Sequence, residues 1–167
     1  MAVEAARSLV PRILLVGEYN PHSRADAHAL LPTPKGATGD RLRRILGVST
    51  SQYMRAFDRT NLLMTPRWDG KLARQVADGL THTRRILLGA RVAAAHGLKF
   101  LPFHRFLVVY PFKQYRALIL PHPSGLCRIW NERGAAKAAR DAVARFILEF
   151  PREECERETL QSVVAGR

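Results

Sequence analysis

Short apolar runs that alternate with helical patterns constrain the fold of this 167-residue chain more than any other feature. Residues 12–17 and 85–89 are almost continuously aliphatic and end in glycine, and residues 117–120 form a similar run that ends before Pro121. Such runs are typical of strands buried on both faces of a parallel sheet. Residues 60–64 have a related pattern and are expected to form another strand.

Helical patterns fill the intervals between these runs. Helices are predicted over residues 40–46, 49–57, 69–80, 90–96 and 132–150. Asp40 is expected to cap the first of them, and Ser49 or Thr50 the second. A further apolar run at 106–110 either forms a hairpin with the last strand or lies at an edge of the sheet. The alternation predicts an α/β fold, a three-layer α/β/α sandwich with a central, mainly parallel four-stranded sheet.

The chain shows no linker-like stretch, so residues 1–167 are expected to form a single domain with a core over about 12–150 and a helical tail at 151–167. No apolar run approaches the length of about 20 residues that a membrane span needs, and the N-terminus lacks the pattern of a signal peptide. Two cysteines are too few for a disulfide framework. A monomer in the reducing cytoplasm is expected.

The charge balance points to a polyanionic partner. Lysine and arginine number 27 against 14 acidic residues, which gives a net charge of +13. Such an excess favours nucleic acid, because each neutralised phosphate releases condensed counterions. A basic surface without a ligand is the alternative. The histidines show no spacing typical of metal ligands, so no metal or other cofactor is expected.

Polar residues follow the first and last strands, where an α/β protein places its chemistry. The last strand runs into a loop with His122, Ser124, Gly125, Leu126 and Arg128. A loop of this composition suits the binding of a phosphate while one imidazole faces a polar leaving group.

The first strand leads into Glu18, Tyr19, Asn20 and His22, and Asn61 interrupts the second. The Asn20 amide could orient a water without itself being a base, and Glu18 could act as a general base. The structural alternatives are a turn at Asn20, a capping role for Glu18, and hydrogen bonds from Asn61 to loop backbone.

Taken together, four segments in this order resemble the uracil-DNA glycosylase superfamily, namely Val-Gly-Glu-Tyr-Asn-Pro at 16–21, Arg-Thr-Asn-Leu-Leu at 59–63, Ile-Leu-Leu-Gly-Ala-Arg-Val-Ala at 86–93 and Leu-Pro-His-Pro-Ser-Gly at 120–125. The resemblance extends over about residues 12–143. It implies a four-stranded parallel sheet between helices, a flipped nucleotide at the strand ends, and hydrolysis of the N-glycosidic bond to leave an abasic site.

The resemblance also implies roles for single residues. Asn20 would position the water and steady the sugar cation, while His122 would donate to the base carbonyl as negative charge builds on the departing ring. Ser124 would contact a flanking phosphate. Leu126, with Arg128 beside it, would enter the DNA and fill the gap that the flipped base leaves.

For base recognition, the resemblance implies that Asn61 reads the polar edge of a pyrimidine and that an aromatic ring stacks on it. Tyr19, Phe100 and Phe103 are the candidates for stacking. Three features depart from the family pattern. Two cysteines cannot hold the iron–sulfur cluster of some branches. His22 stands where the uracil-specific branch has a tyrosine that blocks substituents on C5. The first motif is one residue longer, so Glu18 is an alternative to Asn20 for handling the water.

These observations predict a monofunctional DNA glycosylase, since no lysine nucleophile for strand cleavage is apparent. Its substrate is either uracil, in base excision repair, or a modified pyrimidine such as the hydroxymethylated or glucosylated cytosine of phage DNA, in antiviral defence. His22 and the longer first motif favour the modified base. Two other classes remain open, a catalytically inactive DNA-binding module of the same fold and a nucleoside hydrolase that acts on free metabolites.

Overall fold

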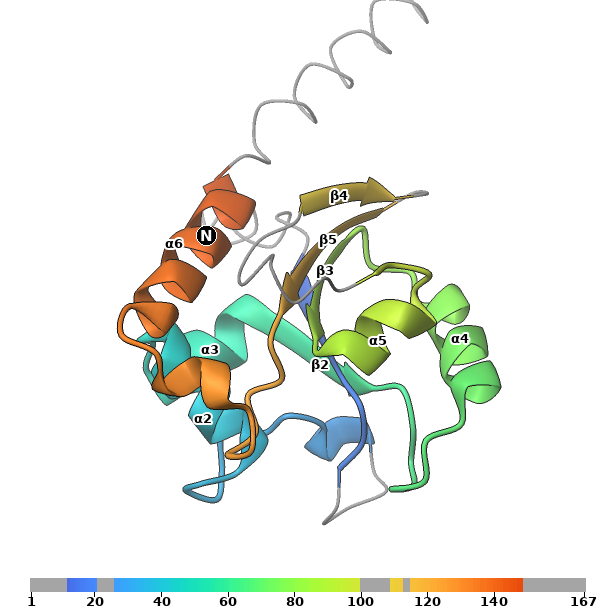
Figure 1. Ribbon diagram of the computed structural model, residues 1–167, viewed down its shortest axis with the longest axis horizontal. Coiled ribbons are helices and arrows are strands. Elements are labelled where there is room, and N and C mark those ends of the chain that lie inside the picture. Colours follow the sequence, from blue (N-terminus) through green and yellow to red (C-terminus); the bar gives the residue numbers. More distant parts are fainter. Residues whose placement is uncertain (1–11, 21–25, 100–108, 113–114, 149–167) are drawn as a thin grey trace, which may run out of the picture.

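The computed structural model describes residues 12–20, 26–99, 109–112 and 115–148. These residues form one five-stranded sheet with the order β2-β1-β3-β5-β4 (Figure 1). Its strands are β1 Ile13–Gly17, β2 Phe57–Asn61, β3 Arg84–Leu88, β4 Val109–Phe112 and β5 Tyr115–Leu120. Strands β2, β1, β3 and β5 run parallel to one another, and β4 pairs antiparallel with β5. The predicted parallel four-stranded sheet is therefore confirmed, with the additional run placed as an edge hairpin strand.

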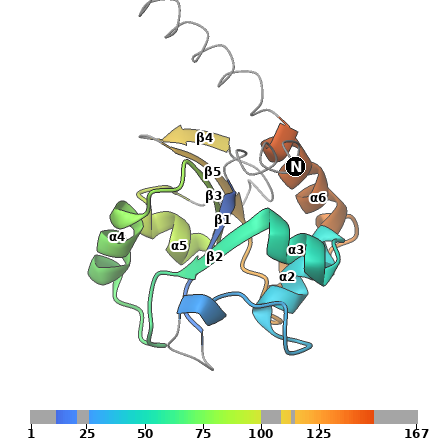
Figure 2. The same ribbon diagram turned by 180° about the vertical axis from the view of Figure 1, so that it is seen from behind.

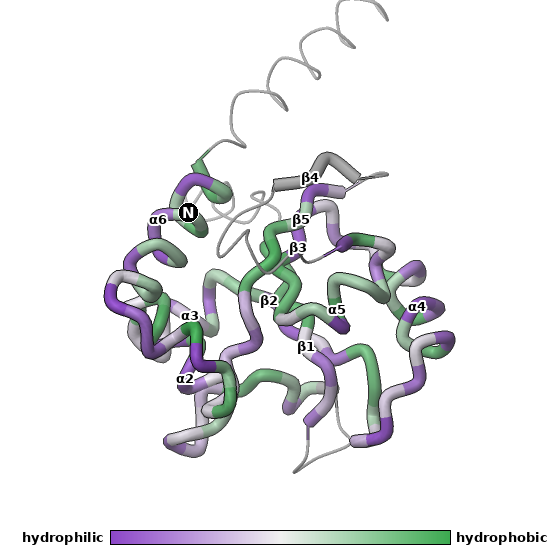
Figure 3. The backbone as a smooth tube through the Cα atoms, in the orientation of Figure 1, coloured by the Kyte–Doolittle hydropathy of each residue, from purple (hydrophilic) through white to green (hydrophobic). Residues whose placement is uncertain are grey.

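Helices cover both faces of the sheet, which confirms the three-layer sandwich (Figures 1 and 2). Ile13 and Leu15 pack on one face against helices α2, α3 and α6, which span Thr38–Leu46, Thr50–Ala56 and Ala135–Leu148. Leu14 and Val16 pack on the other face against α4 and α5, which span Gly70–Gly79 and Ala90–Ala95. Figure 3 shows the resulting concentration of apolar residues in the central strands. Two short 3-10 turns, η1 Asp26–His28 and η2 Arg128–Asn131, complete the described elements.

Of the two helix starts with a predicted capping residue, that of α3 is confirmed and that of α2 is not. Ser49 caps α3 with a full capping box, and Asp69 accepts hydrogen bonds from the first turn of α4. The prediction that Asp40 caps α2 is wrong, because the helix already begins at Thr38. The Asp40 carboxylate is buried inside the first turn, where it accepts the backbone N–H of Gly36.

The second strand lies earlier than predicted, at Phe57–Asn61 rather than 60–64. Half-buried Asp58 and Arg59 interrupt its apolar pattern. An edge strand tolerates such residues because one side meets solvent, and Asp58 is further held by Arg12 at 2.9 Å. Beyond the strand, the N–H groups of Leu62 and Leu63 still bond to the carbonyls of Gly17 and Glu18.

The strand order reverses direction between the central strands β1 and β3. The chain leaves β1 toward β2 on one side of the sheet and leaves β3 toward β5 on the other. Open α/β sheets bind ligands at such a switch in direction. Among the helices of the described ranges, none combines the length and apolar character needed to cross a membrane. The predicted tail at 151–167 lies outside the described residues.

Candidate active site at the carboxyl edge of the sheet

Parallel strand ends bring most of the predicted site residues to one edge of the sheet. Glu18, Tyr19 and Asn20 follow β1, Asn61 is the last residue of β2, and His122 follows β5. The strand register places Gly17 opposite Asn61 and Leu88 opposite Leu120. The side chains after these positions therefore meet at the same edge.

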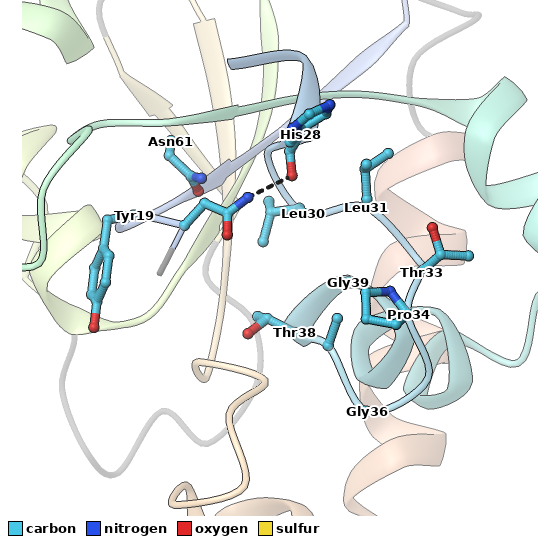
Figure 4. A pocket seen from close by; sticks show the side chains of 12 residues that line it. Tyr19, His28, Leu30, Leu31, Thr33, Pro34, Gly36, Thr38, Gly39 and Asn61 are labelled. Atoms are coloured by element: carbon cyan, nitrogen blue, oxygen red, sulfur yellow. Dashed lines mark hydrogen bonds between the residues drawn. The ribbon is translucent and has the colours of Figure 1, made fainter. Parts of the chain in front are cut away.

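A cavity of about 340 Å³ opens beside the end of β1 (Figure 4). Tyr19, Asn20 and Asn61 form one wall, and residues between His28 and Gly39, including the start of α2, form the other. Clefts of this size are typical of small-molecule sites. His122 and Glu18 are not among its described lining residues and lie further along the same sheet edge.

Asn61 brings an unsatisfied polar group to this cavity. The residue is 6% exposed, and its Oδ1 is buried without a hydrogen-bond partner among the described residues. The expected alternative, a structural amide that bonds to loop backbone, is therefore not seen for this oxygen. A buried acceptor without a partner costs about 1–3 kcal/mol, so a ligand that satisfies the amide would gain from it.

Gly17 allows the Asn61 amide to lie where it does. A Cβ atom built on Gly17 would clash with Asn61 Oδ1 and also press on the Leu30 side chain. The glycine at the end of the first strand thus has a steric role that the sequence pattern alone could not assign. It makes room for the amide of the neighbouring strand.

Asn20 is oriented by a hydrogen bond across the cavity wall. Its Nδ2 donates to the backbone carbonyl of His28 at 3.0 Å, as the dashed line in Figure 4 marks. This bond fixes which end of the amide is the donor and so defines Oδ1 as the acceptor end. Tyr19 lines the same cavity, which keeps it as a candidate for stacking on a base. The other predicted base-binding residues, His22, Phe100 and Phe103, lie outside the described residues.

His122 is held by its own loop. The backbone N–H of Ser124 donates to Nδ1 at 3.2 Å, and the indole N–H of Trp130 donates to the His122 carbonyl at 2.9 Å. Because Nδ1 is an acceptor, the proton of the neutral ring is on Nε2. Burial lowers the pKa of His122, although the nearby Glu18 carboxylate acts to raise it. The ring is therefore a neutral Nε2–H donor near neutral pH.

Gly89 lets His122 cross the end of β3. Its φ of +98° is in the region that favours glycine, and a Cβ atom there would lie 3.1 Å from the Cβ of His122. Its backbone N–H also donates to the Leu120 carbonyl at 2.8 Å. With no side chain at this position, the imidazole approaches the end of β1.

Glu18 interacts electrostatically with His122 and with Arg91. Its carboxylate lies 3.6 Å from the Arg91 guanidinium and interacts with His122. Arg91 in turn lies over the ring of Trp68, at 5.9 Å from the ring centre. This arrangement places Glu18 between two groups that bear or can bear positive charge.

The loop after β5 exposes the residues that were predicted to contact DNA. Leu126 is 93% exposed, the highest value among the large hydrophobic residues in the described ranges. Gly125 and Arg128 are exposed, and Ser124 is half-buried. Trp130 anchors the far end of this loop by packing against the core that α6 covers.

Two residues near the site were not anticipated. Arg41 of α2 extends to the β5 loop, where its Nη1 would lie 3.2 Å from a Cβ on Gly125. Arg43 and Arg44 pair with Asp40, whereas no acidic side chain of the described residues pairs with Arg41. Thr38 lines the cavity from the start of α2. The positions of Arg41 and Thr38 near the site depend on how distant parts of the chain come together, so no local sequence signal could have identified these residues.

Within the described ranges, no three histidine, cysteine, aspartate or glutamate side chains are grouped so that they could hold a metal ion. Comparison of the chain with protein-family models, with curated proteins and with solved structures found no match.

Proposed function

We propose that this protein is a monofunctional DNA glycosylase, which flips a base from DNA and hydrolyses its N-glycosidic bond. The observation that carries the proposal is the state of His122, a partly buried neutral imidazole whose Nδ1 is occupied by the Ser124 N–H. Such a ring presents a fixed N–H donor at the sheet edge where Asn61 and Asn20 line a cavity.

In this reaction His122 stabilises the departing base. As the C1′–N bond breaks, the electron pair moves onto the ring and negative charge builds on its carbonyl oxygen. The Nε2–H of His122 donates to that oxygen, and this hydrogen bond strengthens as the charge develops. Because the donor is fixed in advance, little reorganisation is needed when the bond breaks.

Asn20 positions the water that attacks C1′. Its amide cannot take up a proton, so the proton of the water passes to solvent or to the departing base after the sugar cation has formed. Asn20 suits this role better than Glu18, since it lines the cavity and its amide is oriented by the His28 carbonyl. Glu18 tunes the charge around His122 instead.

The loop after β5 and the start of α2 hold the DNA. Leu126 fills the space of the flipped base, while Ser124, Gly125 and Arg128 contact the backbone beside it. Arg41 supplies a further phosphate contact next to Gly125. We place this reaction in the cytoplasm. The substrate is uracil or a modified pyrimidine, and we favour the modified base, which would give the enzyme a role in defence against phage.

The Asn20→Ala substitution tests this proposal. We expect it to abolish base release in single-turnover assays while DNA binding stays within a few-fold of the unsubstituted protein, because the DNA-contacting loop is untouched. Asn131→Ala, an exposed residue of η2, is the control. Base release that persists in Asn20→Ala would contradict the assigned role. If the unsubstituted protein binds DNA yet releases no base, the fold acts as a DNA-binding module. Weak, salt-insensitive DNA binding would instead indicate a hydrolase of free nucleosides.

A further inference from the structure

A second concave surface lies along the segment that joins β2 to α4, on the side of the sheet that α4 and α5 cover (Figure 1). It is an open groove of about 510 Å³ whose described lining residues are Thr65, Arg67, Trp68, Asp69, Gly70 and Leu72. None of these residues also lines the cavity beside Asn61. A cavity of about 150 Å³ is enough to bind benzene, so the groove has room for a nucleobase.

The indole of Trp68 has a fixed position in this groove. The ring is half-buried and packs against the apolar cluster between the sheet and helices α4 and α5. The chain that leads to it is held at the end of β1, where the Leu63 N–H donates to the Glu18 carbonyl at 2.9 Å. A ring that the core supports and that lines an open groove provides a rigid surface for stacking, because little side-chain freedom is lost when a ligand binds.

The Arg91 guanidinium lies beside the indole but is not stacked on it. It is 5.9 Å from the centre of the Trp68 ring, whereas Arg85 stacks on Tyr115 at 3.7 Å. The Arg91 side chain is also 62% exposed. An aromatic ligand can therefore reach the indole after a small movement of an exposed side chain, and Arg91 then supplies a positive charge next to it.

The charge around the groove favours a phosphate next to the stacked ring. Arg67 lines the groove and is exposed, as is Arg91 at its border. The acidic Asp69 also lines it, but its Oδ1 accepts the N–H groups of Lys71 and Leu72 as the cap of α4. The two arginines exceed this single acidic group, so the groove matches a ligand that carries both an aromatic base and a phosphate.

The groove lies next to the groups proposed to act in the reaction. Arg91 is 3.6 Å from the Glu18 carboxylate, and Glu18 interacts with His122. Tyr19, which lines the cavity proposed for the target base, packs against the same apolar cluster as Trp68. A strand whose target nucleotide occupies that cavity would therefore bring a neighbouring nucleotide to the groove.

Stacking determines which form of DNA fits. In an intact duplex both faces of each base are covered by its neighbours, so only an unpaired base can stack on a protein ring. An aromatic ring that stacks on a base, with basic side chains along the backbone, is the usual arrangement for binding single strands without reading their sequence.

We propose that this groove binds an unpaired base of the target strand, stacked on Trp68, with its phosphate beside Arg67 and Arg91. The groove would hold a nucleotide next to the flipped one, so the proposal rests on the glycosylase function above and deepens it. It names the form of DNA that the protein recognises, which is single-stranded DNA or a duplex opened around the target base rather than an intact duplex.

Tryptophan fluorescence tests the stacking directly. Trp68 and Trp130 are the only tryptophans of the chain, and the Trp68→Phe variant leaves only Trp130. A short oligothymidylate, which forms no duplex by itself, is titrated into both proteins. We expect saturable quenching in the unsubstituted protein that is mostly lost in Trp68→Phe, because a stacked base quenches the indole beside it. The duplex of the same strand with oligoadenylate should give no such difference.

Binding affinity provides the second measurement. Trp68→Leu should weaken binding of the oligothymidylate by about 10- to 100-fold, the usual effect of losing one stacked base, and should leave duplex binding within a few-fold. Trp68→Phe should retain most of the affinity, because it keeps a ring. Tyr115→Leu is the matched control, since Tyr115 packs against the same cluster but begins β5 at the opposite edge of the sheet. It should bind both DNAs as the unsubstituted protein does.

The Arg67→Gln variant provides a test that does not depend on packing, should Trp68→Leu prove unstable in thermal unfolding. Arg67 is exposed, so the fold should be unaffected. Binding of the oligothymidylate should weaken a few-fold, and the slope of log affinity against log salt should fall by about 0.7, the change expected for one phosphate contact on a single strand. Arg74→Gln, further along α4 and outside the groove, should leave the slope unchanged.

Equal quenching in the unsubstituted protein and Trp68→Phe, equal losses of single-stranded and duplex binding in Trp68→Leu, the same loss in Tyr115→Leu, or identical slopes for Arg67→Gln and Arg74→Gln would overturn the proposal. The glycosylase function is judged separately from base release. Release of a base without Trp68-dependent quenching supports the function and rejects the groove. Trp68-dependent quenching without release of any base supports the groove and rejects the function.

Discussion

The two sides of the site differ in how they are built. On the β1–β2 side, a preformed cavity is lined by Asn61, whose buried Oδ1 has no hydrogen-bond partner among the described residues. On the β5 side, Nδ1 and the backbone carbonyl of His122 accept hydrogen bonds from Ser124 and Trp130, and the apolar Leu126 is exposed. A buried polar atom without a partner gains a hydrogen bond when a ligand binds, whereas a side chain that is already hydrogen-bonded is held in one geometry. The first side therefore suits the choice of base and the second suits its removal from DNA.

This division predicts the largest loss of activity on the β5 side. His122→Ala should lower single-turnover base release by about 100- to 1,000-fold, the usual effect of removing one donor to developing negative charge. DNA affinity should change little. His82→Ala, which removes a surface histidine paired with Asp58, is the control. A loss of less than tenfold would mean that the two sides are not divided as described.

On the cavity side, Asn61→Ala should weaken binding of the base by about 10- to 100-fold through the loss of one or two hydrogen bonds. The free energy of unfolding should fall by no more than about 1 kcal/mol, because the side chain's oxygen has no partner to lose. Chemical denaturation and oligonucleotide binding measure the two effects. A large loss of stability with unchanged binding would show that Asn61 has a structural role.

The pH profile separates the two roles considered for Glu18. Base release requires neutral His122, so it should decline as the pH falls through the pKa of that residue. Burial lowers this pKa below its ordinary value of about 6.5, so the decline should be centred below pH 6.5. Glu18 acts to raise the pKa, and Glu18→Gln should therefore move the decline to still lower pH. A plateau rate reduced by about 100-fold or more, with no movement of the decline, would instead identify Glu18 as the general base.

The smallest predicted effect concerns Arg41. Arg41→Gln should weaken DNA binding a few-fold and reduce the slope of log affinity against log salt by about 1, the change expected for one phosphate contact. Arg74→Gln in α4, on the other face of the sheet, should leave the slope unchanged. Identical slopes for both variants would remove Arg41 from the DNA-contacting surface.

Most of the fold could be predicted because buried parallel strands leave a strong local pattern. Aliphatic runs predict β1, β3 and β5. The predicted position of β2 is too late in the chain because Asp58 and Arg59 obscure the start of this strand. The predicted start of α2 is wrong because Asp40 is a residue type that often caps helices, whereas here its carboxylate accepts the Gly36 N–H inside the first turn.

The site residues on strand ends could also be proposed from the sequence, since the carboxyl ends of parallel strands meet. The second wall of the cavity could not, because Thr38 approaches Asn61 only after the chain has folded. The same holds for the contact of Arg41 with Gly125 and for the position of the proton on His122. These features depend on distances between remote segments, which no local pattern contains.

The most direct test of the account is mass spectrometry of bases released from DNA. The protein is incubated in parallel with DNA that contains uracil, unmodified cytosine, hydroxymethylated cytosine or glucosylated cytosine, beside the His122→Ala variant. A glycosylase that uses His122 should release a free pyrimidine base and leave abasic sites in at least one of these DNAs, with little or no release by the variant. Absence of any released base, or equal release by the His122→Ala variant, would contradict it.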